Sequence, residues 1–177
     1  MNVCVFCGSS AGIKSEFAET ARELGELLAK KGHTLIYGGG NIGLMGILAD
    51  SALEHAGKVI GIIPDFLIKK EVGHNGLTSL EVVLSMHERK RRMADLADAF
   101  IVLPGGWGTL DETAEILTWI QLGLIHQPIG LVNIMGYFDF LLAQMNHMVS
   151  EGFLNPKNMD FVKVDNTPAK VLQLLAS

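Results

Sequence analysis

The sequence predicts an α/β protein with a doubly wound parallel sheet, in which a layer of helices covers each face of the sheet. Two observations predict this three-layer α/β/α fold. Short apolar runs alternate with segments of helical periodicity from one end of the chain to the other. Runs such as "KVIGII" and "AFIVL" are apolar throughout, as expected for strands with helices on both faces.

The expected elements follow one another as strand and helix along nearly the whole chain. The first strand alternates in the manner of a buried strand, and several later ones are continuously apolar. We expect strands at 2–7, 34–37, 58–63, 81–84, 99–103, 128–133 and 161–164. We expect helices at 15–31, 43–56, 86–97, 109–124, 137–151 and 167–176. Without a linker, repeat or low-complexity stretch, residues 1–177 are expected to form a single domain.

Composition favours a folded domain and excludes several function classes. Of the 177 residues, 49% are hydrophobic and 19% are charged, which is typical of a compact protein. The net charge of −5 argues against a nucleic acid polymer as partner. No run approaches the roughly 20 apolar residues of a membrane span, and the N-terminus lacks the pattern of a signal peptide. We therefore expect a cytoplasmic protein that does not bind membranes.

Two cysteines and six histidines are the residues best suited to bind a transition metal. Cys4 and Cys7 form a C-x-x-C, but an offset of three along a strand places them on opposite faces of the sheet. The histidines show no zinc-ligand spacing, and "HERKR" is not H-E-x-x-H. We expect neither a metal site nor a redox pair.

Three strand-to-helix turns are rich in glycine or small residues: "CGSSAG" (7–12), "GGGNIGLMG" (38–46) and "PGGWGT" (104–109). Such turns lie at one edge of a parallel sheet, where ligands bind. Since backbone N–H groups at helix N-termini bind anions, the turns predict a ligand that carries phosphate. Candidate ligand contacts within them are Ser9, Gly39, Gly40 and Gly105.

The second turn matches the dinucleotide-binding pattern G-x-G-x-x-G at Gly38, Gly40 and Gly43. It follows the second expected strand rather than the first, and no acidic residue closes the next strand at the usual spacing. The G-x-x-x-x-G-K-[S/T] sequence of ATPases is also missing. We interpret this turn as lining a nucleotide site without NAD, and we expect no organic cofactor.

The third turn continues as "PGGWGTLDE", for which two interpretations are open. Thr109 as N-cap and Glu112 as third helical residue would form a capping box. A cap does not require Gly105, Gly106 and Gly108 together, whereas close approach of the backbone to a phosphate does.

Helical spacing places the two acids of this segment differently. Glu112 is in line with Ile116 and Ile120 on the inward stripe. Its carboxylate is therefore expected to be partly desolvated, which favours acid–base chemistry. Asp111 is expected to face solvent.

The helix that carries "HERKRR" has one cation on its buried stripe. Arg89 falls on this stripe, whereas Arg91 and Arg92 fall outside it. A cation on a buried face needs an anionic partner. The candidates are Glu112, Glu71, Glu88 and a phosphate of the ligand.

Together, these segments resemble the Lonely Guy (LOG) family of cytokinin riboside 5'-monophosphate phosphoribohydrolases, often mislabelled as lysine decarboxylases. The resemblance rests on "CGSS", "YGGGNIGLMG", "VIGIIP", "MHERK" and "PGGWGTLDE", in this order and spacing. It implies a Rossmann-like fold and hydrolysis of the N-glycosidic bond of a purine nucleoside 5'-monophosphate, which is AMP, N6-prenyl-AMP or both. The products would be the free base and ribose 5-phosphate. The resemblance also implies a homodimer, which apolar segments such as "ILTWIQLGLI" favour.

By motif, the resemblance implies Arg89 and Glu112 as the catalytic pair. Trp107 stands where the family commonly has tyrosine, and the stretch around Glu71 departs from the family pattern. The implied substrate contacts, to which we add Met86, are Glu71, Lys90, Gly106, Trp107, Gly108, Thr109, Leu110, Asp111 and Thr118.

The implied reaction gives Glu112 a chemical role. Cleavage develops positive charge on the sugar, which a carboxylate stabilises while it positions or deprotonates water. Arg89 would anchor the substrate, orient Glu112 or assist the leaving base. The alternative is a nucleotide-binding or carrier protein of the same fold, in which the acids are structural.

Overall fold

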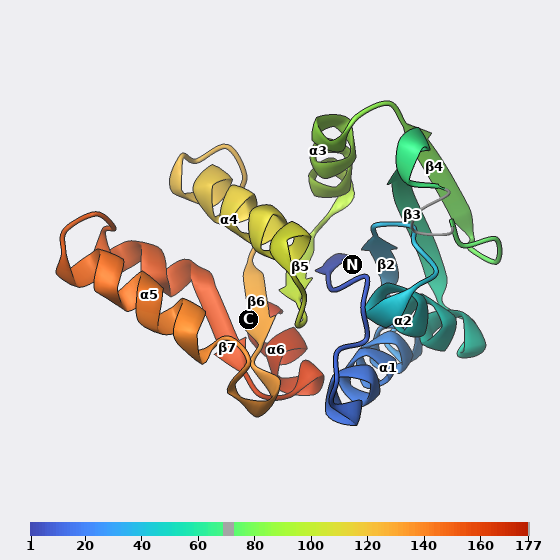
Figure 1. The fold of residues 1–177 in the computed structure, drawn as a ribbon, viewed down its shortest axis with the longest axis horizontal. Coiled ribbons are helices and arrows are strands. Elements are labelled where there is room, and N and C mark those ends of the chain that lie inside the picture. Colours follow the sequence, from blue (N-terminus) through green and yellow to red (C-terminus); the bar gives the residue numbers. More distant parts are fainter. Residues whose placement is uncertain (69–72, 177) are drawn as a thin grey trace.

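Seven parallel strands form one sheet in the computed structural model of the protein, which describes residues 1–68 and 73–176 (Figure 1). The strands are β1 (Asn2–Phe6), β2 (Thr34–Tyr37), β3 (Lys58–Pro64), β4 (Ser79–Val83), β5 (Ala99–Val102), β6 (Ile129–Val132) and β7 (Val162–Asp165). The α-helices are α1 (Ser15–Lys30), α2 (Gly43–Glu54), α3 (Met86–Leu96), α4 (Trp107–Gln121), α5 (Asp139–Ser150) and α6 (Pro168–Leu175).

These elements confirm the predicted order of strands and helices, with ends that differ by a few residues. The structure adds the short 3₁₀ helices η1 (Asp65–Leu67), η2 (Ile134–Gly136) and η3 (Pro156–Phe161). In the described part of the chain, no helix is both long and apolar enough to cross a bilayer.

The strand order is β4-β3-β2-β1-β5-β6-β7. The chain builds one half of the sheet outward from β1, then returns to place β5 on the other side of β1. Phe6 of β1 lies beside Val102 of β5, so both strands end at the same edge. The order of the strands therefore reverses between β1 and β5, which is where open α/β sheets bind ligands.

Helices pack on both faces of the sheet and create two apolar cores (Figure 1). Residues of α1, α2 and α6 cover one face, while α3, α4 and α5 contribute to the core on the other. Cys7 belongs to the first core and Cys4 to the second. The prediction that these cysteines lie on opposite faces is thus confirmed, and both are free thiols.

The three turns that the sequence analysis identified meet at this edge of the sheet. The Gly8 N–H donates a hydrogen bond to the Pro104 carbonyl at 3.0 Å, and the Leu44 N–H donates to the Gly8 carbonyl at 3.1 Å. Backbone hydrogen bonds therefore tie the turn after β1 to the turns after β5 and β2.

Candidate active site

A cavity of about 160 Å³ opens where the three turns meet. It lies beyond the ends of β1 and β5, at the reversal of strand order. The lining residues are Val5, Phe6, Cys7, Ser9, Gly38, Met45, Arg89, Met93, Gly106, Trp107, Gly108, Thr109 and Glu112.

Two helices bring the predicted catalytic pair into this cavity. Arg89, on α3, is only 5% exposed, and its Nη2 donates a hydrogen bond to the Gly38 carbonyl at 3.0 Å. Its Nη1 lies 3.9 Å from the sulfur of Met86, which places Met86 beside the guanidinium. Glu112, on α4, is half-buried at the cavity wall, as its inward stripe predicts. The cavity therefore holds a fixed cation and a carboxylate.

The charges of Glu112 and Arg89 both influence the pKa of the Cys7 thiol, which lines this cavity. Burial, followed by the negative charge of Glu112, raises the pKa of Cys7 above its ordinary value, while the positive charge of Arg89 opposes the shift. Both charges thus act on the same cavity wall. Because the thiol stays protonated at neutral pH, Cys7 is not a nucleophile here.

The start of α3 is fixed by a capping interaction that the sequence analysis missed. The Glu88 N–H donates to Ser85 Oγ at 3.1 Å, and the Leu84 N–H donates to the Glu88 carboxylate at 2.9 Å. This arrangement resembles a capping box. Glu88, one of the acids considered as a partner for Arg89, therefore binds backbone at the helix start. The signal was available as "SMHE".

Of the two interpretations left open for "PGGWGTLDE", the structure contradicts the capping box of Thr109 and Glu112. Helix α4 begins at Trp107 with Gly106 as N-cap, so Thr109 lies buried inside the first turn and Glu112 lies in the second. The helix starts earlier because glycine is accepted at the N-cap and lets the chain enter the helix directly. Helix geometry leaves the N–H groups of this first turn without intrahelical acceptors. They come from Trp107, Gly108 and Thr109, which all line the cavity.

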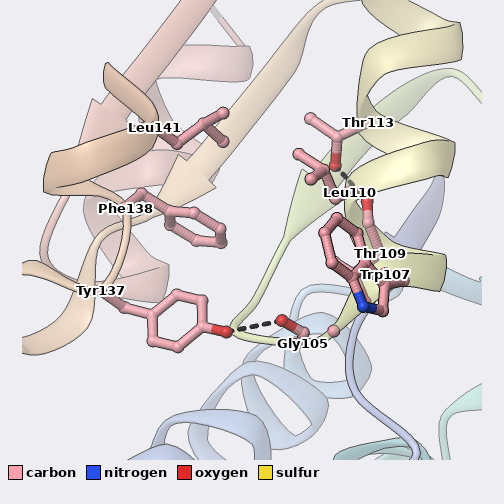
Figure 2. Close-up of a pocket in the computed structure, with 9 residues that line it drawn as sticks. Gly105, Trp107, Thr109, Leu110, Thr113, Tyr137, Phe138 and Leu141 are labelled. Atoms are coloured by element: carbon pink, nitrogen blue, oxygen red, sulfur yellow. Dashed lines mark hydrogen bonds between the residues drawn. The ribbon is translucent and has the colours of Figure 1, made fainter. Parts of the chain in front are cut away.

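A second cavity of about 250 Å³ adjoins the first and shares Gly106, Trp107 and Thr109 with it. Figure 2 shows Tyr137 and Phe138 on one side of it, facing Trp107 and Leu110 on the other. Trp107, which is 87% exposed, stands at the boundary between the two cavities. The full lining is Gly105, Gly106, Trp107, Thr109, Leu110, Thr113, Tyr137, Phe138 and Leu141.

Tyr137 is a site residue that sequence reasoning missed. Its hydroxyl donates a hydrogen bond to the Gly105 carbonyl at 2.5 Å, which anchors the glycine loop (Figure 2). Met135 and Gly136, with positive φ values of 54° and 70°, turn the chain so that Tyr137 reaches this edge. The available signal was the position of this turn, since it also leads from a strand into a helix.

Two other predicted contacts pair with each other instead of lining either cavity. Lys90 Nζ lies 3.0 Å from Asp111 Oδ2 and 3.0 Å from Glu115 Oε2. Asp111 is exposed, as predicted.

Three other predicted contacts, Gly39, Gly40 and Thr118, line neither of these two cavities. The Gly39 carbonyl accepts a hydrogen bond from the His74 N–H at 3.0 Å, and Gly40 pairs with Gly73. Thr118 lies in a separate groove between α4 and α5, with its hydroxyl donating to the Ala114 carbonyl. Glu71 lies outside the described residues.

Comparison with known proteins agrees with the resemblance. Residues 45–175 match a family model described as "possible lysine decarboxylase". A probable cytokinin riboside 5'-monophosphate phosphoribohydrolase of Oryza sativa subsp. japonica is 46% identical over 173 residues, which are 97% of this chain and 76% of that protein. This chain belongs to the Lonely Guy family.

A second Lonely Guy relative, a cytokinin riboside 5'-monophosphate phosphoribohydrolase of Arabidopsis thaliana, is 46% identical over 154 residues, covering 87% of this chain and 72% of that protein. Among solved structures, the molybdenum cofactor binding protein of the phototrophic bacterium Rippkaea orientalis superposes with a TM-score of 0.73. It is 22% identical, and the match covers 99% of this chain and 95% of that one. This likeness shows that the Lonely Guy chain and that protein share a fold.

Proposed function

We propose that this protein hydrolyses the N-glycosidic bond of purine nucleoside 5'-monophosphates, releasing the free base and ribose 5-phosphate. The observation that carries the proposal is the cavity in which Arg89 and Glu112 lie beside the first turn of α4. The curated names of the relatives, cytokinin riboside 5'-monophosphate phosphoribohydrolases, support the same substrate class.

The first turn of α4 is suited to hold the 5'-phosphate. The N–H groups of Trp107, Gly108 and Thr109 lie at the positive end of the helix dipole, which favours an anion. With the phosphate there, the sugar extends toward Glu112 in the next turn of the same helix. Phosphate binding and catalysis then depend on one helix start.

Glu112 stabilises the positive charge that develops on the sugar as the bond to the base breaks. It also takes a proton from the water whose oxygen forms the new bond to C1'. The base leaves with the electron pair of the broken bond and takes up a proton from solvent, while Glu112 returns its proton to solvent. A guanidinium has five N–H donors and no acceptor, so Arg89 is suited to donate hydrogen bonds to the substrate.

AMP and N6-prenyl-AMP are both proposed substrates. The second cavity, with Tyr137, Phe138 and Leu141 on one wall, offers apolar surface next to the catalytic cavity. Trp107 stands between the cavities, so it is suited to influence which base is accepted.

The proposed assembly is a cytoplasmic homodimer. A groove of about 500 Å³ between α4 and α5 is lined largely by apolar side chains, including Leu117, Met145 and Met148. Contact with a second copy would remove this surface from water. Light scattering of the purified protein tests this point, and a monomeric mass would contradict it.

The test of the activity is a product assay with AMP and N6-isopentenyl-AMP as parallel substrates. We expect chromatography to show free base and ribose 5-phosphate from at least one of them. Nucleoside plus inorganic phosphate would indicate a phosphatase and contradict the proposal. Tight binding of AMP without any product would favour the alternative, a nucleotide-binding or carrier protein.

A further inference from the structure

A lysine joins the two helices that carry the catalytic pair. Lys90 follows Arg89 on α3, and its ammonium lies 3.0 Å from a carboxylate oxygen of Asp111 and 3.0 Å from one of Glu115. Asp111 directly precedes Glu112 on α4. The Lys90 side chain is only 11% exposed, whereas the side chains of Asp111 and Glu115 are 59% and 25% exposed, so the lysine end of the bridge is the shielded one. The bridge therefore connects the residues next to Arg89 and Glu112.

Helices α3 and α4 both pack on β1 but otherwise on different elements. Helix α3 packs on β1 to β4, whereas α4 packs on β1 and η3 (Figure 1). Side chains join the two helices: besides the Lys90 bridge, the Arg91 guanidinium lies 6.0 Å from the centre of the Trp119 ring. The distance from Arg89 to Glu112 is therefore sensitive to these side-chain contacts.

The charge of Lys90 is maintained by its partners. Desolvation alone would lower the pKa of Lys90, but hydrogen bonds and charges of Asp111 and Glu115 outweigh it and raise that pKa above its ordinary value. Asp111 and Glu115 are four residues apart on α4, where two like charges repel each other. Lys90 neutralises this repulsion while it pulls α4 toward α3.

We propose that Lys90 is a positioning residue, which holds α3 and α4 at the separation at which Arg89 and Glu112 act on the same glycosidic bond. It acts through the bridge, whereas the family resemblance implies a substrate contact at this position. This inference rests on the proposed function. A displacement of about 1 Å at a reacting centre is enough to lower a rate by roughly 100-fold.

The test compares steady-state kinetics on AMP for Lys90→Met, which removes the cation, and for the double variant Asp111→Asn/Glu115→Gln, which removes the anions. We expect each to lower kcat by roughly 10- to 100-fold. KM stays within about twofold, because a lost positioning interaction acts in the transition state. Combining all three substitutions is expected to lower kcat no further, since the residues act as one unit. Lys90→Arg is expected to retain more of kcat than Lys90→Met.

A matched control is Arg92→Met. Arg92 is on the same helix, but its Nε pairs with Glu81 of β4 at 2.9 Å, away from α4. We expect its kcat to be unchanged, and melting curves establish that each variant is folded.

Two results would overturn the inference. The first is a rise in KM at unchanged kcat in Lys90→Met, which would make Lys90 a substrate contact. The second is a kcat of the wild-type value in Asp111→Asn/Glu115→Gln, a result that stays informative even if Lys90→Met does not fold. Absence of turnover of both AMP and N6-isopentenyl-AMP by the wild-type protein is distinct from both results. It would contradict the proposed function itself. There would then be no reaction for which Lys90 could position Arg89 and Glu112.

Discussion

Two glycine-rich turns at the same edge of the sheet use glycine for opposite reasons. In the turn after β2, protein atoms occupy the space that a side chain would need. A Cβ on Gly38 would lie 1.9 Å from Arg89 Nη2, and one on Gly43 would lie 2.3 Å from the Ser9 backbone. Glycine occupies these two positions because other parts of the protein pack directly against them.

In the turn after β5, two of the three glycines face open space. No described atom lies within 4 Å of a Cβ placed on Gly106 or on Gly108. Both glycines line the cavity at the start of α4. Gly105 is the exception, since its Cβ would lie 2.1 Å from Thr109 Oγ1. A run of glycines therefore indicates that other atoms approach the backbone closely. Whether those atoms belong to the protein or to a ligand depends on the packing around each glycine.

The turn after β2, in which protein atoms pack against the glycines, is expected to show the largest effect of a substitution on stability. Gly43→Ala places a methyl group against the Ser9 and Ser10 backbone at a φ of +60°. A left-handed residue with a Cβ costs about 1–2 kcal/mol, and overpacking adds about 1–3 kcal/mol. Denaturant unfolding measures the sum.

Gly32→Ala is the matched control for Gly43→Ala, because Gly32 also has a positive φ, of 68°, and no described atom within 4 Å of its Cβ. We expect only the backbone term of about 1–2 kcal/mol in this variant. Equal losses in the two variants would contradict the packing explanation.

A substitution in the turn after β5, where the glycines face open space, is expected to weaken substrate binding without lowering stability. In Gly108→Ala, the methyl group would occupy space proposed for phosphate, so KM for AMP is expected to rise about tenfold, equivalent to about 1.4 kcal/mol. The folded protein is expected to gain up to about 1 kcal/mol, since alanine is the better helix former. Kinetics and unfolding curves on one preparation measure both effects. A destabilised Gly108→Ala variant with an unchanged KM would contradict the distinction between the turn after β2 and the turn after β5.

The third turn, after β1, begins at Cys7, and its chemistry predicts an effect on stability that depends on pH. Burial raises the pKa of both Cys4 and Cys7 in the folded protein. Their contribution to stability is therefore complete below the ordinary cysteine pKa of about 8.5 and declines as pH rises. The expected decline is about 1.4 kcal/mol per thiol and pH unit above that value. Unfolding curves between pH 8 and pH 10 test this, and a free energy of unfolding that rises with pH would contradict it.

Features that depend on local pattern could be predicted from the sequence. Apolar periodicity located the strands and helices, and the inward stripe of α3 identified Arg89 as a buried cation. The stripe of α4 likewise placed Glu112 at the cavity wall. These predictions succeeded because side-chain direction follows directly from helix geometry.

Features that depend on distant contacts could not be predicted. Helix α4 starts early because Gly106 is its N-cap, whereas the T-x-x-E pattern suggested Thr109 as the N-cap. Tyr137 reaches Gly105 across 32 positions of sequence. The partners of Lys90 depend on how α3 and α4 are placed by the sheet, which no spacing within either helix specifies.

The most direct test of the account is Glu112→Gln, which preserves the shape of the side chain and removes its charge. Acid–base catalysis contributes about 10²- to 10⁴-fold, so we predict a loss of kcat of at least about 100-fold. Because glutamine has the shape of glutamate, the melting temperature and the affinity for AMP, measured by calorimetry, are predicted to stay close to wild type. Wild-type turnover in a folded Glu112→Gln variant would contradict the account, and so would loss of the fold.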